Sequence, residues 1–441
     1  MSNHGNKMGV VHLTILTAVN MLGSGIIMLP TKLAEVGTMS ILSWLVTAMG
    51  SLALAWAFSK CGLFSTKSGG MGGYAEYAFG KSGNFIANYT YAISLLIANI
   101  AIAISAVGYG SVLFNANLSP VSVCLATIAV LWITTVCNFG GARITGRIGS
   151  VTVWGVIIPV VGLCIIGWFW FSPTLYVSAW NPNHLDFFSA ISTSISMTLW
   201  AFLGLESACA NMDAVENPQK NVPIAVFGGT LVCAVIYVLS TNVISGIVPN
   251  SDLLHSTAPF GLAYATLFTP SVGNVVMFLM ALACIGSLLG WQFTVAQVFK
   301  SSSDIGYFPR IFSRVNSKDA PIVGMIILGV IQTMLALMTI SPSLNKQFNS
   351  LVNLAVVTNL VPYVLSMAAL IPMQRLAGIT GNQVKSNAFI ALIGTIYSFY
   401  ALYASGDEAM MLGALVTFSG WTFWGMFIQK KDNVVADIYQ G

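Results

Sequence analysis

Apolar stretches of about 20 residues recur along the whole chain, and this repetition constrains its fold more than any other feature. A helix of that length spans the hydrocarbon core of a bilayer and satisfies its backbone polar groups internally. Charged residues make up 7% of the 441 residues, whereas soluble domains carry about 25%. The sequence therefore predicts an all-α integral membrane protein that forms one transmembrane domain over residues 1–441, with no separate soluble domain.

Twelve apolar segments can be placed on the sequence as transmembrane helices. Their predicted bounds are 11–35, 38–62, 84–112, 119–138, 150–171, 188–211, 223–248, 274–300, 321–341, 348–372, 388–405 and 408–428. The first segment is too long for the apolar region of a signal peptide, and no A-x-A cleavage site follows it. We therefore expect it to remain as the first span. An even number of spans places both termini on the same side of the membrane.

Lysine and arginine are distributed unevenly between the two sides of this predicted topology. If both termini are cytoplasmic, the outer side receives only Lys32 and Lys346 out of 17 basic residues. Short cytoplasmic loops of membrane proteins carry an excess of lysine and arginine, so this is the expected orientation. We therefore predict a multi-pass protein of the cell inner membrane with both termini in the cytoplasm. The basic residues indicate topology, and no nucleic-acid partner is needed to explain them.

Two of the predicted spans contain glycines that would interrupt a helix in mid-membrane. The first carries Gly-Ser-Gly at 23–25, and the sixth carries Gly204. Glycine also serves close packing between membrane helices, and a single such motif would favour that explanation. Interruptions in corresponding spans of two halves instead mark the binding site of a secondary transporter, because unwound backbone needs a cavity beside it. The spacing of five spans predicts an inverted repeat of 11–171 and 188–372, with 388–428 appended.

Glu206 is a carboxylate in the interior of the sixth span, too far from either end to reach water. A charge at mid-bilayer costs at least roughly 2.5–3.5 kcal/mol, so such residues usually line a cavity or an ion path. Trp200 lies six residues before it and Gly204 two residues before it. An acid, an aromatic ring and a weakened backbone together suit an organic cation. The alternative is a protonated Glu206 that only joins helices together.

The sequence offers no recognisable chemistry for an enzyme. It lacks a Ser/His/Asp set and a metal-ligand cluster, and the glycine-rich SGGMGG at 68–73 is not followed by the GK[ST] of a phosphate loop. The seven cysteines are scattered through apolar segments with no CxxC pair. We therefore expect no catalysis, no cofactor and no bound metal. Glu76, beside the glycine-rich stretch, is either a solvated acid at a helix end or a residue of a transport path.

Four long motifs make the sequence recognisable. They are NMLGSGIIMLP (20–30), KSGGMGGYAEYAFG (67–80), WAFLGLESACANMDAVENPQKNVPIA (200–225) and SLLGWQFTVAQVFKSSSDIGYFP (287–309). In these motifs and from end to end, the chain resembles the basic amino acid/polyamine antiporter branch of the APC superfamily, and within it the bacterial putrescine–ornithine exchangers. The resemblance implies a LeuT-type fold of five plus five spans and two more, with spans 1 and 6 broken. It also implies an exchange site between spans 1, 3, 6 and 8, with span 10 or 12 as a further candidate.

The resemblance assigns individual residues to this exchange site. They are Gly23, Ser24, Gly25, Tyr91, Asn99, Trp200, Glu206, Trp291 and Trp424. Backbone N–H groups of 23–25 would bind the α-carboxylate of ornithine, Trp200 would close over the substrate, and Glu206 would meet its ammonium and the proton path. Trp291 would wall the site from span 8, while Tyr91 and Asn99 would face it from span 3. A member of the family carries a tyrosine where Trp424 stands, so a hydroxyl that such a ring would offer to the substrate is missing in this chain.

By resemblance, the expected function is exchange of putrescine for ornithine across the inner membrane by alternating access, with proton-coupled uptake of putrescine through Glu206. The expected partners are these two amines, protons and membrane lipid, and the question of a homodimer stays open. An arginine/agmatine or a lysine/cadaverine antiporter of the same branch is the nearest alternative. A sodium-coupled symporter of neutral amino acids and a membrane receptor that does not transport are two further alternatives.

Overall fold

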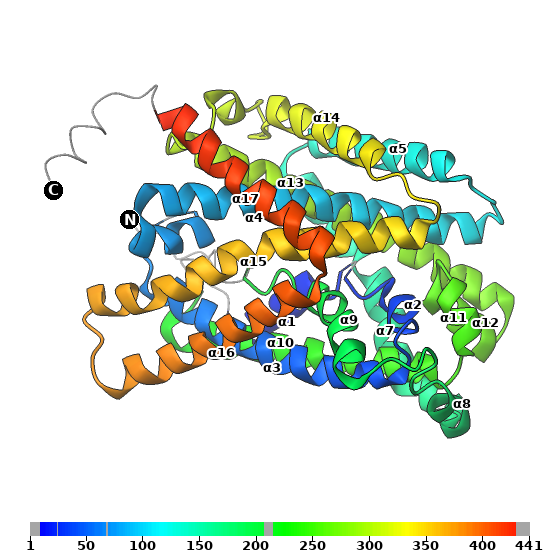
Figure 1. The fold of residues 1–441 in the computed structure, drawn as a ribbon. Helices are drawn as coiled ribbons and strands as arrows, with labels where there is room; N and C mark the ends of the chain where they lie inside the picture. Colours follow the sequence, from blue (N-terminus) through cyan, green and yellow to red (C-terminus); the bar gives the residue numbers. More distant parts are fainter. Residues whose placement is uncertain (1–8, 24, 68, 207–214, 429–441) are drawn as a thin grey trace, which may run out of the picture.

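The computed structural model describes residues 9–23, 25–67, 69–206 and 215–428, and the regular structure in these ranges is helical. The long helices run side by side along one direction (Figure 1). Eight segments of this part of the chain are long and apolar enough to cross a membrane. In chain order they are η1 (Thr38–Ser40) with α3 (Ile41–Phe64), α4 (Met71–Leu113), α5 (Pro120–Asn138), α6 (Ala142–Thr152) with α7 (Trp154–Ile166) and η2 (Gly167–Trp170), α10 (Pro218–Ser245), α13 (Pro270–Asp304), α15 (Leu344–Leu376) and α16 (Asn382–Ala404).

Two of the predicted spans are interrupted, as their glycines indicated. The first is split into α1 (Val10–Met21) and α2 (Leu29–Leu33), and the sixth has α9 (Phe187–Trp200) followed by turns through Glu206. Two more predicted spans are α14 (Ile322–Met338) and α17 (Asp407–Ile428). Each of the predicted ranges thus overlaps helix, which confirms the all-α class. That twelve segments span the membrane, and that they form an inverted repeat, stay predictions.

A helical piece that the prediction did not include precedes the third span, which we expected to start at residue 84. Helix α4 covers Met71–Leu113, but Gly80 within it has a φ of 65° and a ψ of −161°, which are not helical values. Two helical pieces therefore meet at a kink at Gly80, and the second piece begins close to the predicted start. Glycine adopts this conformation at little cost. Short helices absent from the prediction are α8 (Pro173–Ser178), α11 (Asn250–His255), α12 (Pro259–Leu267) and η5 (Arg310–Ser313). The first three lie at the right-hand end of Figure 1 and are too short to span a bilayer.

Several helices begin at residues that supply the hydrogen bond missing from a first helical turn. Ser119 accepts from the backbone N–H of the third residue after it at the start of α5, Thr269 does the same for α13, and Ser343 for α15. Proline follows Ser119 and Thr269 at the first helical position, where it has no N–H to leave unpaired. These local signals determine where the spans begin.

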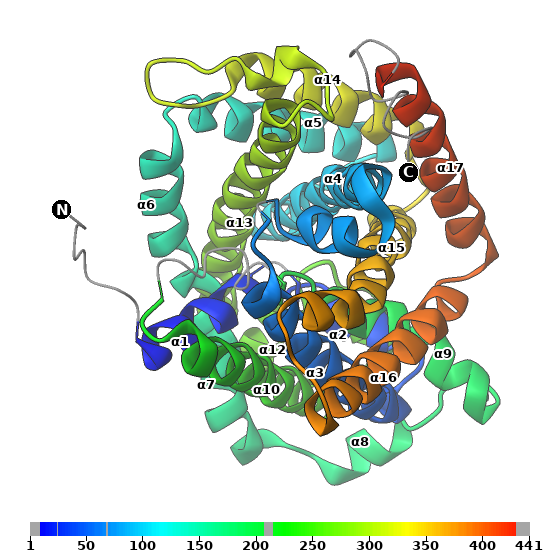
Figure 2. The ribbon, with the colours of Figure 1, turned by 90° about the vertical axis from the view of Figure 1, so that its left-hand side faces the viewer.

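Helix α4 lies near the centre of the bundle and packs on α13 and α15 (Figure 2). Helices α5 and α14 lie above it in this view, and α3, α10 and α16 lie below. Buried hydrogen bonds join helices on both sides. Gln292 of α13 donates to Gln332 of α14 at 3.3 Å, and the hydroxyls of Thr47 in α3 and Thr198 in α9 lie 2.6 Å apart. These bonds satisfy polar groups that would be costly to leave unpaired in an apolar bundle.

Two of the predicted inner connections lie at the same end of the molecule. The turns after α3 and after α15 lie at the left-hand end of Figure 1, opposite α8, α11 and α12. Lys67 lies in the first of these turns, and Arg375 lies at the end of α15. Helix α2, which carries the predicted outer residue Lys32, lies towards the other end. This arrangement agrees with the uneven distribution of basic residues, while the side of the membrane that each end faces stays a prediction.

Candidate functional site

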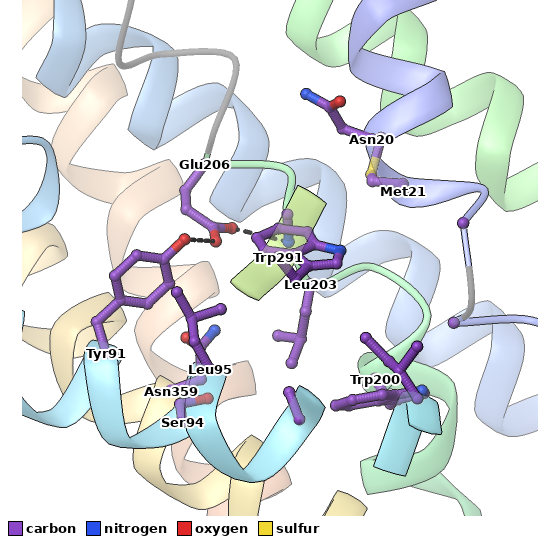
Figure 3. Close-up of a pocket in the computed structure, with 15 residues that line it drawn as sticks. Asn20, Met21, Tyr91, Ser94, Leu95, Trp200, Leu203, Glu206, Trp291 and Asn359 are labelled. Carbon is purple, nitrogen blue, oxygen red and sulfur yellow. Dashed lines mark hydrogen bonds between the residues drawn. The ribbon is translucent and has the colours of Figure 1, made fainter. Parts of the chain in front are cut away.

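A cavity of about 40 Å³ lies where the two interrupted helices meet (Figure 3). On the same measure a single water needs about 10–15 Å³, so this is more than a one-water void. Six of the nine residues predicted for the exchange site line it, namely Gly23, Gly25, Tyr91, Trp200, Glu206 and Trp291. They come from the interruption after α1, from α4, from the end of α9 with the turns after it, and from α13. The fold therefore brings together residues that are far apart in the sequence.

Neighbouring atoms leave little room for a side chain at either interruption, which favours glycine there. A Cβ atom on Gly25 would lie 3.1 Å from the Cα atom of Ala201. Gly204 has a φ of +105°, a value that side chains disfavour, and a Cβ atom there would lie 3.2 Å from the Trp291 ring. The cavity thus lies beside two pieces of unwound backbone that are in contact.

Helix α9 brings Trp200 and Glu206 to the cavity, and its start is capped by Asp186. The Asp186 carboxylate accepts hydrogen bonds from the Ser189 hydroxyl and from the N–H groups of Ser189 and Phe188, the latter two at 3.2 and 3.0 Å. These bonds, those from Ser189 first, hold the pKa of the Asp186 carboxyl below its usual value. An ionised carboxylate at this position also interacts favourably with the helix dipole.

The carboxylate of Glu206 is buried, with 6% of the residue exposed, and three donors from the part of the chain that the structure describes converge on it. The Tyr363 hydroxyl of α15 lies 2.5 Å from Oε2, the Gly204 N–H donates to the same oxygen at 3.1 Å, and the Tyr91 hydroxyl of α4 donates to Oε1 at 3.2 Å. Figure 3 shows the carboxylate beside the cavity with Tyr91 next to it. A carboxylate has about four lone-pair positions, so three donors leave acceptor capacity for an ammonium. Within the described residues, no group of three His, Cys, Asp or Glu side chains is placed to hold a metal ion.

Two tryptophan rings form apolar walls of the cavity. Trp200 is 5% exposed and meets the Phe348 ring edge-on, with 6.5 Å between ring centroids. Trp291 also lines a second cavity of about 380 Å³, which lies between α1, α6, α7 and α13. The two cavities share Asn20, Gly23 and Trp291, so the Trp291 ring lies at the boundary between them.

Of the remaining three predicted residues, the two that the structure describes, Asn99 and Trp424, do not line the cavity. Ser24 lies outside the described residues. Asn99 is fully buried in α4 without lining the cavity, and neither polar atom of its side chain has a hydrogen-bond partner among the described residues. The Trp424 ring of α17 packs instead against Phe85 and Tyr307, with 5.2 and 5.8 Å between ring centroids. The roles of these three residues in binding stay predictions.

Sequence reasoning missed Tyr363, which is fully buried on α15 and makes the shortest of the three hydrogen bonds to Glu206. It also missed Asn20, Ser94 and Asn359, which line the cavity. The available signal was weak: Asn359 and Tyr363 are polar residues four apart in an otherwise apolar part of their span. That spacing places both on one face of a helix, but it does not tell which neighbour the face meets.

Known proteins resemble this chain over almost its whole length. The family model described as Amino acid permease matches residues 8–428. The chain is 73% identical over 421 residues to the Putrescine transporter PotE of Escherichia coli (strain K12), which covers 96% of each chain. It is 67% identical over 432 residues to the Putrescine transporter PotE of Haemophilus influenzae, covering 98% of this chain and 99% of that one. The Cadaverine/lysine antiporter of Escherichia coli (strain K12) is 32% identical over 409 residues, 91% of this chain and 90% of that one.

Proposed function

This chain belongs to the amino acid permease family of membrane transporters, and from that premise we propose that it exchanges putrescine for ornithine across the cell inner membrane. Two relatives with 73% and 67% identity are named putrescine transporters, which supports putrescine as one substrate. The cadaverine/lysine antiporter is only 32% identical, so the similarity favours putrescine over that pair of substrates.

The observation that carries this proposal is the buried Glu206 carboxylate beside a cavity between two unwound segments. One ammonium group of putrescine would bind the remaining acceptor positions of Glu206, close to the ring of Trp200. Ornithine would place its side-chain ammonium at the same carboxylate, and backbone N–H groups of the interruption after α1 would bind its α-carboxylate. One acid then serves both substrates, whereas the unwound backbone serves only ornithine.

The apolar walls suit the hydrocarbon part of a diamine. Each of the four methylenes of putrescine gains about 0.8 kcal/mol when it is buried. A cation over a tryptophan face gains about 0.5–2 kcal/mol. These gains offset part of the cost of removing water from two ammonium groups. We therefore expect a modest affinity, which suits a carrier that must also release its substrate.

For the fold, we propose twelve membrane-spanning helices in a LeuT-type arrangement of five, five and two. The packing supports an inverted repeat because helix pairs have counterparts when the two halves are exchanged. Helix α1 packs on α10, which pairs span 1 with span 7, and α9 packs on α3, which makes the corresponding pair of span 6 with span 2. Helix α4 packs on α15, which pairs span 3 with span 10, and α13 packs on α6 and α7, which makes the corresponding pair of span 8 with span 5. Both termini would then lie on the cytoplasmic side, at the basic end of the molecule.

Transport would proceed by alternating access around the cavity. Trp200 would close over the bound substrate, and Trp291 would separate it from the larger cavity between α1, α6, α7 and α13. A rocking of α1, α3, α9 and α10 against α4, α5, α13 and α14 would open the site to each side in turn. Exchange follows if the empty carrier reorients slowly, so that a loaded site must return. Glu206 is also the carboxyl that we assign to proton-coupled uptake of putrescine.

Counterflow tests the proposal. Full-length protein is reconstituted into proteoliposomes loaded with unlabelled ornithine, and labelled putrescine is added outside. We expect labelled putrescine to accumulate transiently when ornithine is inside, and to do so equally with and without sodium. No flux with any internal amine would indicate a receptor that does not transport, and a requirement for sodium would indicate a symporter.

The same vesicles separate putrescine from the other substrates of this branch. Diamines of three, four and five methylenes, together with agmatine, are added as competitors of labelled putrescine. Strongest competition by the four-methylene diamine is the expected result. Strongest competition by cadaverine or by agmatine would instead assign lysine/cadaverine or arginine/agmatine exchange to this chain.

A further inference from the structure

Tyr237 of α10 contacts both interruptions, although it is not among the residues that line the cavity. Its hydroxyl lies 2.7 Å from the carbonyl oxygen of Met21 and 2.8 Å from that of Ala201. Met21 is the last residue of α1, and Ala201 directly follows the end of α9. Carbonyls at the end of a helix lack a partner within it, so both oxygens need a donor from elsewhere.

The Tyr237 hydroxyl carries one proton, and two carbonyl oxygens share it. Without that proton, the two oxygens would face each other and repel. Gly25 lies at the same crossing, since a Cβ atom on it would lie 3.4 Å from the Ala201 oxygen and 3.6 Å from the Met21 oxygen. The hydroxyl therefore ties the two unwound segments together where they pass each other.

Aromatic neighbours hold the Tyr237 ring in place. The ring stacks on Trp44 with 5.7 Å between centroids and 30° between planes, and it meets Phe202 edge-on at 5.3 Å. All three rings are fully buried. One turn earlier on α10, the Cys233 thiol lies 3.5 Å from the carbonyl oxygen of Ala18 in α1. Helix α10 thus holds the end of α1 through two side chains, and the surrounding rings fix the position of the Tyr237 hydroxyl.

We propose that Tyr237 is a positioning residue for transport, whose single hydroxyl holds the ends of α1 and α9 in the arrangement that forms the cavity. This inference rests on the proposed function, because its kinetic test needs exchange activity. Met21 lines the cavity, and its own carbonyl binds Tyr237. Trp200 also lines the cavity and directly precedes Ala201, whose carbonyl binds Tyr237. A shift of either carbonyl therefore moves a wall of the site. Loss of the hydroxyl weakens substrate binding without removing any group that touches the substrate.

The variant Tyr237→Phe removes the hydroxyl and keeps the stacked ring. Tyr264→Phe is a matched control, because the buried Tyr264 also donates to a carbonyl, that of Pro159 at 2.9 Å, and Pro159 belongs to α7 and to neither interruption. In counterflow with the full-length protein, Tyr237→Phe should raise the KM for putrescine about three- to tenfold, as expected for one neutral hydrogen bond. Tyr264→Phe should change the KM for putrescine by less than about twofold, even when its melting temperature equals that of Tyr237→Phe or is lower.

Hydrogen–deuterium exchange measures how firmly the two unwound segments are held, and it does not depend on transport activity. Amides of 25–28 and 201–206 should exchange faster in Tyr237→Phe than in the wild type, and Tyr264→Phe should leave them unchanged. Amide exchange equal in the two variants would overturn the inference. Faster amide exchange with an unchanged KM would also overturn it, because Tyr237 would then affect structure alone. A wild-type protein without any flux would refute the proposed function instead, and amide exchange would still decide whether the hydroxyl ties the two segments.

Discussion

The substitution Glu206→Gln removes the charge from the cavity and keeps the shape of the side chain. The structure lets the amide fit, because its oxygen can replace Oε2 and accept from Tyr363 at 2.5 Å and from the Gly204 N–H at 3.1 Å. Its NH₂ group then meets the Tyr91 oxygen, which lies 3.2 Å from Oε1 and whose hydroxyl can turn to accept. The fold should tolerate the change, so we expect the substitution to weaken binding of the ammonium group and to leave folding intact.

A hydrogen bond to a charged group contributes about 1.5–3 kcal/mol, and its loss corresponds to roughly a 10- to 150-fold rise in the KM for putrescine. Counterflow and thermal unfolding are measured on the same preparations. Glu408→Gln, which removes an exposed acid at the start of α17, is the control and should leave KM unchanged. Stimulation of putrescine uptake by an imposed pH gradient should be absent from Glu206→Gln. A KM within about a factor of two of wild type would refute this reasoning, as would a rise in KM that comes with a large fall in melting temperature.

Three further predictions concern the surroundings of the cavity. Tyr363→Phe removes a buried hydroxyl that donates to a carboxylate, so the free energy of unfolding should fall by about 1.5–3 kcal/mol in thermal unfolding. Gly25→Ala places a Cβ atom 3.1 Å from Ala201, so it should cost about 1–3 kcal/mol and reduce exchange, whereas Gly110→Ala, with nothing within 4 Å, should leave exchange unchanged. The pKa of Asp186 is lowered in the folded protein, so its stabilisation is present above the unfolded value of about 3.9 and is lost as the pH falls through the folded value. Asp186→Asn should therefore lower the melting temperature more at about pH 7 than at about pH 3. Equal effects of the two alanine substitutions, or an Asp186 effect that does not change with pH, would contradict these assignments.

The sequence alone located the carboxylate and both interruptions because their signals are local. Glu206 is conspicuous among apolar neighbours of one span, and the glycines at 23–25 and 204 stand in mid-span in the same way. The structure confirms that helix ends at both places. Span bounds follow from length and hydropathy where no glycine intervenes: the predicted 119–138 corresponds to α5 at Pro120–Asn138. Such features need no knowledge of how the helices pack.

Residues whose role depends on helix rotation could not be placed in this way. Tyr363 meets Glu206 because of the direction in which α15 faces the turns after α9. Asn359 and Tyr363 mark one face of α15, but the sequence does not tell which neighbouring helix that face meets. Asn99 is the reverse case, because it lies eight residues after Tyr91 on α4 and yet does not line the cavity. Eight residues carry a helix about 80° beyond two full turns, which is enough to move Asn99 from the cavity face into the packed interior.

The cavity lies where helical backbone has been opened, and side chains take over the pairing of the opened groups. Gly204 N–H is bound by Glu206, the carbonyls at the ends of α1 and α9 share Tyr237, and the carbonyl of Ile27 accepts from Tyr109 at 3.1 Å. In lipid these groups would have no water to bind instead. The carboxylate that pairs the backbone is also the one available to an ammonium, so binding and backbone pairing use the same group. Most substitutions here will therefore change stability and transport together, and Glu206→Gln is informative because it changes the charge while keeping the acceptor for the Gly204 N–H.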